Sequence, residues 1–340
     1  MALSVYYGDI HNHCGISYGH GPLEDALANA RQQLDFCSVT GHAHWPDMPD
    51  EPGRLDGLVQ YHLDGFAKLA DNWPAVLDTM NGANDPGRFV TFPSFEWHSM
   101  RSGDHAIYYR DGVGELLRPD SIEDLHAQLT ALDAVGVAVM ANPHHIGYLR
   151  GSRGINWDHY KPRFSPVVEM MSMHGCAESD ESPKPYLHTM GPSDVTSTMH
   201  YGLAQGHVFG VVGSTDHHSA HPGSYGHGRM GVWAEDLTRE AIWDAIHARR
   251  TYALTGDRIA LDFTLNGHAM GSVIEDGDPS RHLSVTVEGG AAIHEVDVLR
   301  NGRLVHRHSP LPFADPPPND PARAKILLAL GWGERGSTTH

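Results

Sequence analysis

The sequence predicts an α/β protein in which short strands alternate with helices and close into a barrel, followed by a small β-rich domain. Short apolar runs recur along the first 256 residues, segments with helical spacing lie between several of them, and the pattern changes to strands alone after Gly256. Alternating strands and helices favour a parallel sheet, and this many repeats favour closure into a (β/α) barrel. The predicted domains are therefore residues 1–256 and 257–340.

Strands are predicted where a short apolar, β-branched or aromatic run is bounded by turn or polar residues. In chain order these runs are Val5–Tyr7, Phe36–Thr40, Phe89–Phe95, Ala106–Tyr109, Val137–Ala141, Val167–Met171 and Val208–Gly213. Helices are predicted where helical spacing follows a start signal such as Pro22, Ser121 or Thr238. They cover Leu23–Gln33, Leu58–Ala70, Ile122–Ala134 and Ile242–Arg249.

The second domain is expected to be a small antiparallel, sandwich-like β structure. Its predicted strands are Ile259–Asn266, His282–Glu288, Glu295–Arg300 and Arg303–Arg307. Asn301-Gly302 between the last two is typical of a tight hairpin turn. We expect a loop over Pro310–Pro321 and a last strand over Lys325–Trp332, and whether this β domain is complete stays open.

The charge, the apolar runs and the cysteines of the chain indicate which kinds of substrate and partner to expect. The formal charge of −18 disfavours extended nucleic acid, because phosphate contacts depend on clustered Lys and Arg. No apolar run approaches the roughly 18 residues that cross a bilayer, so no membrane association is predicted. Three cysteines without a C-x-x-C pair predict reduced thiols, and a first motif that begins by Asp9 favours a cytoplasmic protein without a signal peptide. A small-molecule substrate is expected, and a homo-oligomer stays open.

Histidine is the unusual residue of this chain. Its 27 copies exceed the 24 Lys and Arg combined, and imidazole is the commonest protein ligand for borderline transition metals. His, Asp or Glu follows nearly every predicted strand, and in a barrel these strand ends converge on the catalytic face. In an extended backbone the side chains of residues i and i+2 point the same way. The pair His11 and His13 can therefore bind one ion, and so can the pair Asp216 and His218. With Glu96 between these pairs in sequence, a metal site is predicted.

Five motifs follow one another between about residues 5 and 255. They are Gly8-Asp9-Ile10-His11-Asn12-His13, Thr40-Gly41-His42, Pro93-Ser94-Phe95-Glu96, Pro143-His144-His145 and Asp216-x-His218. This ordered series resembles the PHP (polymerase and histidinol phosphatase) superfamily of phosphoesterases. The resemblance implies a distorted (β/α)7 TIM-like barrel with a centre of two or three Mn²⁺, Fe²⁺ or Zn²⁺ ions.

The resemblance also implies a distribution of ligands. A first ion is held by His11, His13, Glu96 and Asp216; Glu96 bridges to a second ion held by His105 and by His144 or His145; and His42 and His218 hold a third. The sequence departs from the family at Ser17-Tyr18-Gly19 and at Gly41, where aspartate is usual, and His20 is a candidate replacement ligand. We therefore expect at least two ions, with the third position open.

The predicted function is metal-dependent hydrolysis of a small phosphate mono- or diester. Bridged ions lower the pKa of a shared water and supply hydroxide at neutral pH. Asp216 and Glu96 are the predicted catalytic carboxylates, with Arg229 binding phosphate and His217 donating a proton. Arg150, Arg153 and Arg250 are further phosphate candidates, and His98, His174 and His221 are further acid candidates.

Three alternative functions stay open from the sequence. An amidohydrolase-like enzyme cleaves an amide, lactone or carboxyl ester with similar metals, although such barrels commonly bridge them with a carbamylated lysine, where this chain offers Glu96. A non-enzymatic metal-binding protein is the second alternative, but its histidines are expected in contiguous tracts. A nuclease is the third, and the acidic charge disfavours it for long nucleic acid.

Overall fold

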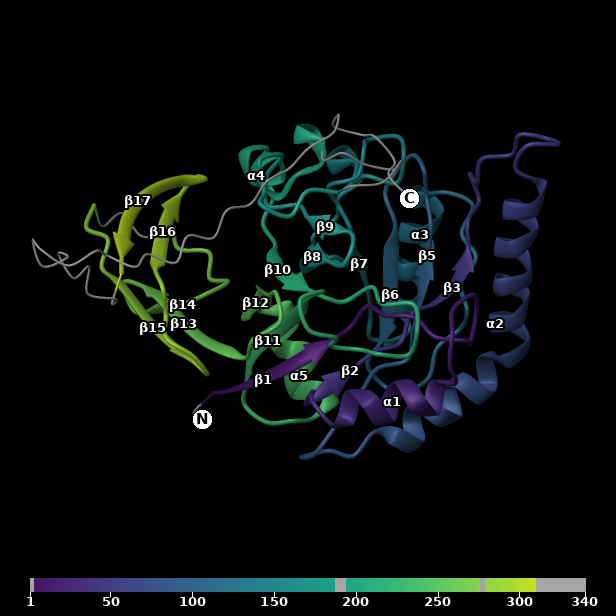
Figure 1. Ribbon diagram of the computed structural model, residues 1–340, viewed down its shortest axis with the longest axis horizontal. Helices are drawn as coiled ribbons and strands as arrows, with labels where there is room; N and C mark the ends of the chain where they lie inside the picture. Colours follow the sequence, from purple (N-terminus) through teal and green to yellow (C-terminus); the bar gives the residue numbers. More distant parts are fainter. Residues whose placement is uncertain (1–2, 187–193, 276–278, 310–340) are drawn as a thin grey trace, which may run out of the picture.

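Three sheets form the body of the protein. The structure is a computed structural model that describes residues 3–186, 194–275 and 279–309 (Figure 1). One sheet has the order β12-β11-β1-β2-β4, with bounds Thr251–Leu254, Arg229–Ala234, Ser4–Asp9, Phe36–Cys37 and Val90–Thr91. The second has the order β3-β5-β6-β7, with bounds Gly41–His44, Ser94–Trp97, His105–Tyr109 and Val139–Pro143. The third has the order β10-β8-β9, with bounds Gly210–Gly213, Val167–Ser172 and Gly175–Cys176.

The strand pairing in the described residues corrects the prediction of a parallel sheet. β1–β2, β2–β4, β3–β5 and β8–β10 are parallel, but β1–β11, β11–β12, β5–β6 and β6–β7 are antiparallel. The connection between β5 and β6, residues 98–104, is too short for a parallel crossover, which needs roughly a dozen residues or more. Hydrogen bonding among the described residues produces several small sheets, so the fold is mixed α/β and barrel closure is not confirmed.

Two predicted strands are interrupted where the chain passes from the first sheet to the second. Phe36–Thr40 and Phe89–Phe95 each begin in the first sheet as β2 and β4, and the chain then enters the second sheet as β3 and β5. Pro93 lies at one crossing and has no backbone N–H to donate to a strand partner. Ser38 joins the two crossings, because its Oγ donates to the Phe92 carbonyl at 2.6 Å. This step brings β3 and β5, with His42 and Glu96, beside each other.

Four of the five α-helices in the described residues occur where the sequence predicts them, one of them with an extension, and the short helix at Met199–Ala204 was not predicted. They are α1 (Leu23–Arg31), α2 (Asp56–Ala83), α3 (Ile122–Ala134), α4 (Met199–Ala204) and α5 (Arg239–His247), and Val195–Ser197 and Trp157–His159 are short 3₁₀ turns. α3 has the predicted bounds, and its N-cap Ser121 Oγ accepts from Asp124 N at 3.1 Å. α2 continues beyond the predicted Ala70 because Trp73, Val76 and Met80 prolong its buried face.

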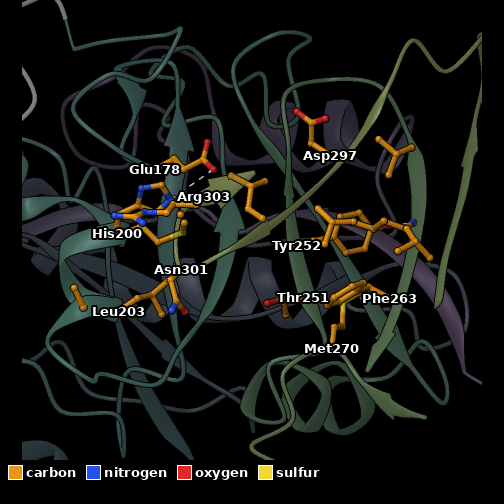
Figure 2. Close-up of a pocket in the computed structure, with 18 residues that line it drawn as sticks. Glu178, His200, Leu203, Thr251, Tyr252, Phe263, Met270, Asp297, Asn301 and Arg303 are labelled. Carbon is orange, nitrogen blue, oxygen red and sulfur yellow. Dashed lines mark hydrogen bonds and ion pairs between the residues drawn. The ribbon is translucent and has the colours of Figure 1, made fainter. Parts of the chain in front are cut away.

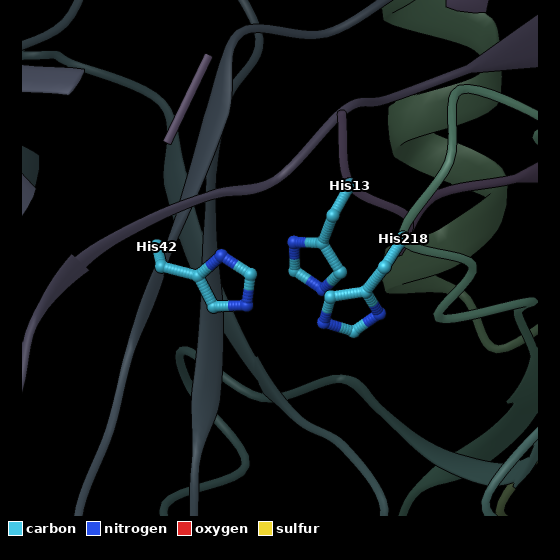
Figure 3. A group of neighbouring side chains, drawn as sticks. All are labelled: His13, His42 and His218. Carbon is cyan, nitrogen blue, oxygen red and sulfur yellow. The ribbon is translucent and has the colours of Figure 1, made fainter. Parts of the chain in front are cut away.

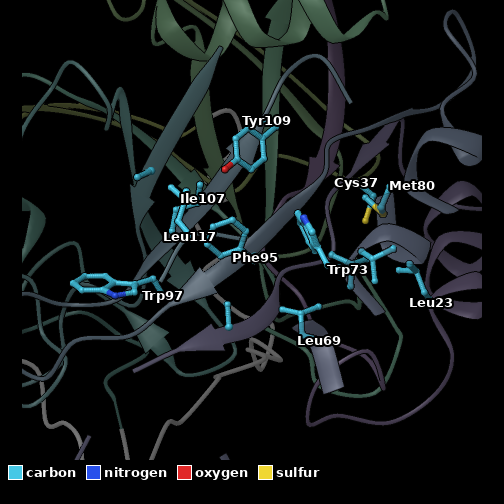
Figure 4. Packing of buried hydrophobic residues seen from close by; sticks show 14 of the residues in the cluster. Leu23, Cys37, Leu69, Trp73, Met80, Phe95, Trp97, Ile107, Tyr109 and Leu117 are labelled. Atoms are coloured by element: carbon cyan, nitrogen blue, oxygen red, sulfur yellow. The ribbon is translucent and has the colours of Figure 1, made fainter. Parts of the chain in front are cut away.

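The main hydrophobic core lies between α2 and the second sheet. Trp73 of α2 packs edge-to-face on Phe95 of β5, with 5.7 Å between ring centroids (Figure 4). Leu69 of the same helix is fully buried and lies against Gly41, where an added Cβ would approach its Cδ1 to 2.7 Å. A side chain at position 41 would therefore require Leu69 to shift within the core, which favours glycine there.

The predicted C-terminal strands are present as antiparallel pairs. β13 (Ile259–Leu265) pairs with β14 (His268–Ala269) and β15 (Leu283–Gly289), and β16 (Val296–Arg300) pairs with β17 (Arg303–His308). No described residue after Gly256 is buried. The domain boundary at residue 256 stays a prediction, and Pro310–Pro321 and Lys325–Trp332 lie outside the described residues.

A cavity of about 1140 Å³ lies where these strands meet the body. Figure 2 shows Leu203 and His200 of α4 on one side of it, and Tyr252 of β12 with Phe263 of β13 on the other. Its lining is mostly apolar, apart from groups such as Glu178 and Arg303. Within the described part of the chain, no helix has both the length and the apolar character needed to cross a bilayer.

Candidate metal centre

The histidines and carboxylates that follow separate strands come together in one buried cluster. His11 and His13 follow β1, His42 lies in β3, Glu96 in β5, and Asp216 follows β10. All five side chains are at most 3 % exposed. The cluster contains several groups of ligand atoms within 4.8 Å of one another.

The first group consists of His11, His13 and Asp216. Nε2 of His13 lies 3.1 Å from Nε2 of His11 and 2.9 Å from Oδ1 of Asp216, and His11 Nε2 is 3.4 Å from the same oxygen. Ligands about 2.1 Å from one ion, at tetrahedral or octahedral angles, lie roughly 3.0–3.4 Å apart. The spacing of these three atoms therefore fits a shared divalent ion.

Glu96 lies at the centre of the cluster. Its Oε2 is buried without a hydrogen-bond partner among the described residues, yet it faces Nε2 of His13 at 3.3 Å, of His42 at 3.6 Å and of His11 at 3.7 Å. Its Oε1 lies 2.9 Å from Nε2 of His144. Although burial opposes ionisation, His98 and His144 hold the pKa of Glu96 well below its usual range. An ionised carboxylate between several imidazoles is the arrangement expected of a bridging ligand.

His13, His42 and His218 form a further group (Figure 3). His218 Nδ1 donates to the Asp216 carbonyl at 2.8 Å, so its Nε2 keeps a lone pair. Ser17 Oγ lies 3.0 Å from His42 Nδ1 and holds the ring with Nε2 toward Glu96. Burial lowers the pKa of His42 well below its usual value, so the ring stays neutral, as a metal ligand must.

A third group unites Glu96, Asp104, His144 and His145, of which Asp104 was not predicted. Asp104 Oδ2 lies 3.5 Å from His145 Nε2 and 3.1 Å from His98 Nδ1. The sequence signal was present but indirect, because Asp104 immediately precedes the predicted ligand His105.

His105 is placed away from the cluster by the alternation of its strand. In the β5–β6 pair, Glu96 lies opposite Ala106 and Trp97 lies opposite His105. Neighbouring residues of a strand point to opposite faces, so His105 shares the face of Trp97 and not that of Glu96. Its Nδ1 donates to the Gly103 carbonyl at 3.0 Å, and burial lowers its pKa to about 3.

Three other predicted residues also lie outside the described ligand groups. His20 is exposed. His217 Nδ1 accepts from Ser219 N at 3.1 Å, so that nitrogen is engaged in its own loop. Arg229 donates to the Gly223 carbonyl at 2.7 Å and to Gln33 Oε1 at 2.6 Å, which makes it a support of the loop that follows Asp216.

Residues behind the ligands fix their orientation. His11 Nδ1 lies 2.7 Å from Oε2 of Glu169, which was not predicted as a site residue, and His174 Nε2 lies 2.8 Å from Oδ2 of Asp216. Asp9 accepts from Thr215 N at 3.1 Å and thereby joins the loop after β1 to the loop after β10. Such partners set the direction of metal-binding side chains. The buried His, Glu and Asp groups together indicate binding of divalent metal ions.

Comparison with known sequences gives relatives without an assigned activity. A family model described as "Protein of unknown function (DUF3604)" matches residues 223–283. An uncharacterized protein of Chlamydia pneumoniae is 26% identical over 264 residues, which cover 71% of this chain and 41% of that protein. One from Chlamydia muridarum is 27% identical over 325 residues, covering 81% of this chain and 50% of that protein. The chain thus spans about half the length, or less, of these relatives.

Solved structures with a partial likeness include several bacterial and archaeal proteins. PsfC from Pseudomonas syringae has a TM-score of 0.46 and 15% identity, covering 75% of this chain and 92% of that one. A two-domain protein from Bacteroides vulgatus containing a predicted PHP-like metal-dependent phosphoesterase has a TM-score of 0.43 and 13% identity, covering 87% and 90%. The lesion-specific endonuclease PfuEndoQ from Pyrococcus furiosus has a TM-score of 0.40 and 13% identity, covering 72% and 56%.

Proposed function

We propose that the chain is a PHP-type, metal-dependent hydrolase that cleaves a small phosphate mono- or diester. The observation that carries this proposal is the buried, ionised Glu96, whose unpaired Oε2 faces the Nε2 atoms of His11, His13 and His42. A carboxylate buried without compensation is costly, so divalent cations are the natural partners of this site. The donor set of imidazole and carboxylate suits Mn²⁺, Fe²⁺ or Zn²⁺.

The ligands divide into neighbouring positions around Glu96. His11, His13 and Asp216 form one position, with Glu96 Oε2 at 3.3 Å from His13 Nε2, and His42 and His218 form the next position with His13. On the other side, Glu96 shares the third group with Asp104, His144 and His145. Ions held here would activate water and polarise the phosphoryl oxygens of the substrate.

The side chains around these positions have separate tasks in this proposal. Asp216 binds through Oδ1, and its Oδ2 is held by His174, which is partly exposed. His174 therefore takes the place proposed for His217 as the donor of a proton to the leaving group. Tyr18 stacks on His42 with 3.6 Å between ring centroids, and its hydroxyl lies 3.3 Å from His98 Nε2. The tyrosine ring therefore lines one side of the site.

The test combines metal content with hydrolysis of p-nitrophenyl phosphate, its diester and p-nitrophenyl acetate. We expect metal-dependent turnover of a phosphate ester, lost in Glu96→Gln and kept in the control Glu178→Gln, which lies outside the ligand groups. Turnover of the carboxyl ester alone would favour the amidohydrolase-like alternative. Metal without turnover would favour a binding protein, and the absence of stoichiometric metal would overturn the proposal.

A further inference from the structure

The guanidinium of Arg153 lies inside the carboxylate cluster. Its Nε donates to Asp104 Oδ2 at 2.5 Å, and its Nη2 contacts the same oxygen. Nη2 also lies 3.6 Å from Glu96 Oε1 and 3.0 Å from His98 Nδ1. The side chain is only 12% exposed, and its Cζ lies 5.1 Å from the ring centroid of Trp45. This arginine is therefore a built-in positive charge of the centre.

The backbone holds Arg153 in this place. Its φ of 71° is in the left-handed region, which a residue with a Cβ adopts only when its surroundings impose it. Arg153 N donates to the Met100 carbonyl at 3.1 Å. At the next residue, Gly154, an added Cβ would meet the Tyr148 carbonyl oxygen at 2.0 Å, so the loop packs tightly on its own chain. The position of the guanidinium is thus a consequence of the fold around it.

Both carboxylates that contact Arg153 belong to one of the three positions described above. Asp104 and Glu96 are the two carboxylates of the group that also contains His144 and His145. Their facing oxygens, Asp104 Oδ2 and Glu96 Oε1, are the oxygens that Arg153 contacts. A divalent ion at this position would lie beside a guanidinium in a buried, weakly screening environment, where like charges repel strongly.

We propose that Arg153 replaces a metal ion at the Glu96–Asp104 position, so that the centre holds two divalent ions and not three. The proposal rests on the proposed function in that it takes the remaining positions to bind metal. Those positions are the His11, His13 and Asp216 group and the His13, His42 and His218 group. Asp9, Glu96, Asp104, Glu169 and Asp216 are the buried carboxylates around the centre, and two divalent ions with one guanidinium balance their charge.

The test counts metal ions and needs no turnover. Purified protein is saturated with Mn²⁺, freed of excess ion by gel filtration, and measured by elemental analysis. We expect two ions per chain in the wild type and three in Arg153→Met, which removes the charge but keeps an extended side chain. Arg153→Lys retains the cation and should hold two. Arg150→Met is the matched control from the same loop, because Arg150 pairs with the exposed Asp158 and should leave the count at two.

The outcomes separate this inference from the proposed function. Three ions in the wild type would overturn it even if the Arg153 variants failed to fold. The same count in wild type and folded Arg153→Met would overturn it as well. Both of these results leave the metal-dependent hydrolase standing, whereas the absence of bound metal in every protein would overturn both proposals.

Discussion

Nδ1 of His11 lies 2.7 Å from Oε2 of Glu169, although 158 residues separate the two in the chain. A carboxylate accepts hydrogen bonds, so when the ring is neutral, as it is in a metal ligand, this contact places its proton on Nδ1 and leaves the lone pair on Nε2. That Nε2 is the atom that faces His13 and Glu96. Glu169 therefore orients His11 so that its Nε2 can bind a metal ion.

Replacing Glu169 with glutamine should weaken metal binding without removing a ligand. The amide is neutral and either presents its NH₂ group to His11 or bonds less strongly through its oxygen, so the ring loses its fixed orientation. Loss of such a partner typically lowers metal affinity by about 10–100-fold. Competition with a chelator of known affinity measures this change.

The number of ions at saturation should stay the same in Glu169→Gln, which distinguishes a positioning residue from a ligand. Glu178→Gln serves as the control, because Glu178 is a partly exposed carboxylate that also faces a histidine, with 3.9 Å between its Oε1 and His200 Nε2. Unchanged affinity in Glu169→Gln would show that His11 does not depend on this contact.

Removing the metal should destabilise the fold. Without cations, Glu96 Oε2 remains buried and unpaired. A ligand that binds only the folded state contributes about 2.7 kcal/mol at a hundredfold excess over its Kd. We expect a chelator to lower the melting temperature by several degrees, and re-addition of Mn²⁺ or Zn²⁺ to restore it. In Asp216→Asn the shift should shrink, and equal shifts in both proteins would mean that the chelator acts elsewhere.

Gly41 should not tolerate a side chain. In Gly41→Ala the new Cβ would lie 2.7 Å from Leu69 Cδ1, within a core that already includes Trp73 and Phe95. Overpacking of this kind costs about 1–3 kcal/mol in the free energy of unfolding, which denaturant titration measures. Gly57→Ala is the control, because nothing lies within 4 Å of its added Cβ. Equal stability of the two variants would argue against the tight contact at Leu69.

The sequence predicts the elements of this protein better than their pairing. Helix α3 could be predicted to the residue because its signals, the Ser121 cap and the apolar spacing, are local. The antiparallel pairing of β11 with β1 joins Met230 to Gly8, and no local pattern reports such a contact. Neither β11 nor β12 was predicted.

The same distinction holds for the metal centre. Spacing of two residues along extended chain was enough to pair His11 with His13. Choosing Asp104 over His105 required the register of β6 on β5, which only the folded chain defines. Arg229 shows the same limit, since the sequence places an arginine near a site loop but does not reveal that its guanidinium donates to Gly223 and Gln33.

His126 should make the protein less stable as the pH falls. It is buried on α3 beside Phe164, and burial, with the nearby charge of Lys161, lowers its pKa to about 4. The unfolded chain titrates near the ordinary value of about 6.5, so between these values it binds more protons than the folded chain. The stabilising effect of the neutral, buried His126 is therefore complete above about pH 6.5 and is lost as the pH falls toward 4.

Denaturant titrations of metal-saturated protein across this pH range measure the effect. The free energy of unfolding should depend less steeply on pH in His126→Leu than in wild type, whereas Gln128→Ala on the same helix should keep the wild-type slope. Parallel curves for His126→Leu and wild type would show that His126 already titrates normally in the folded chain.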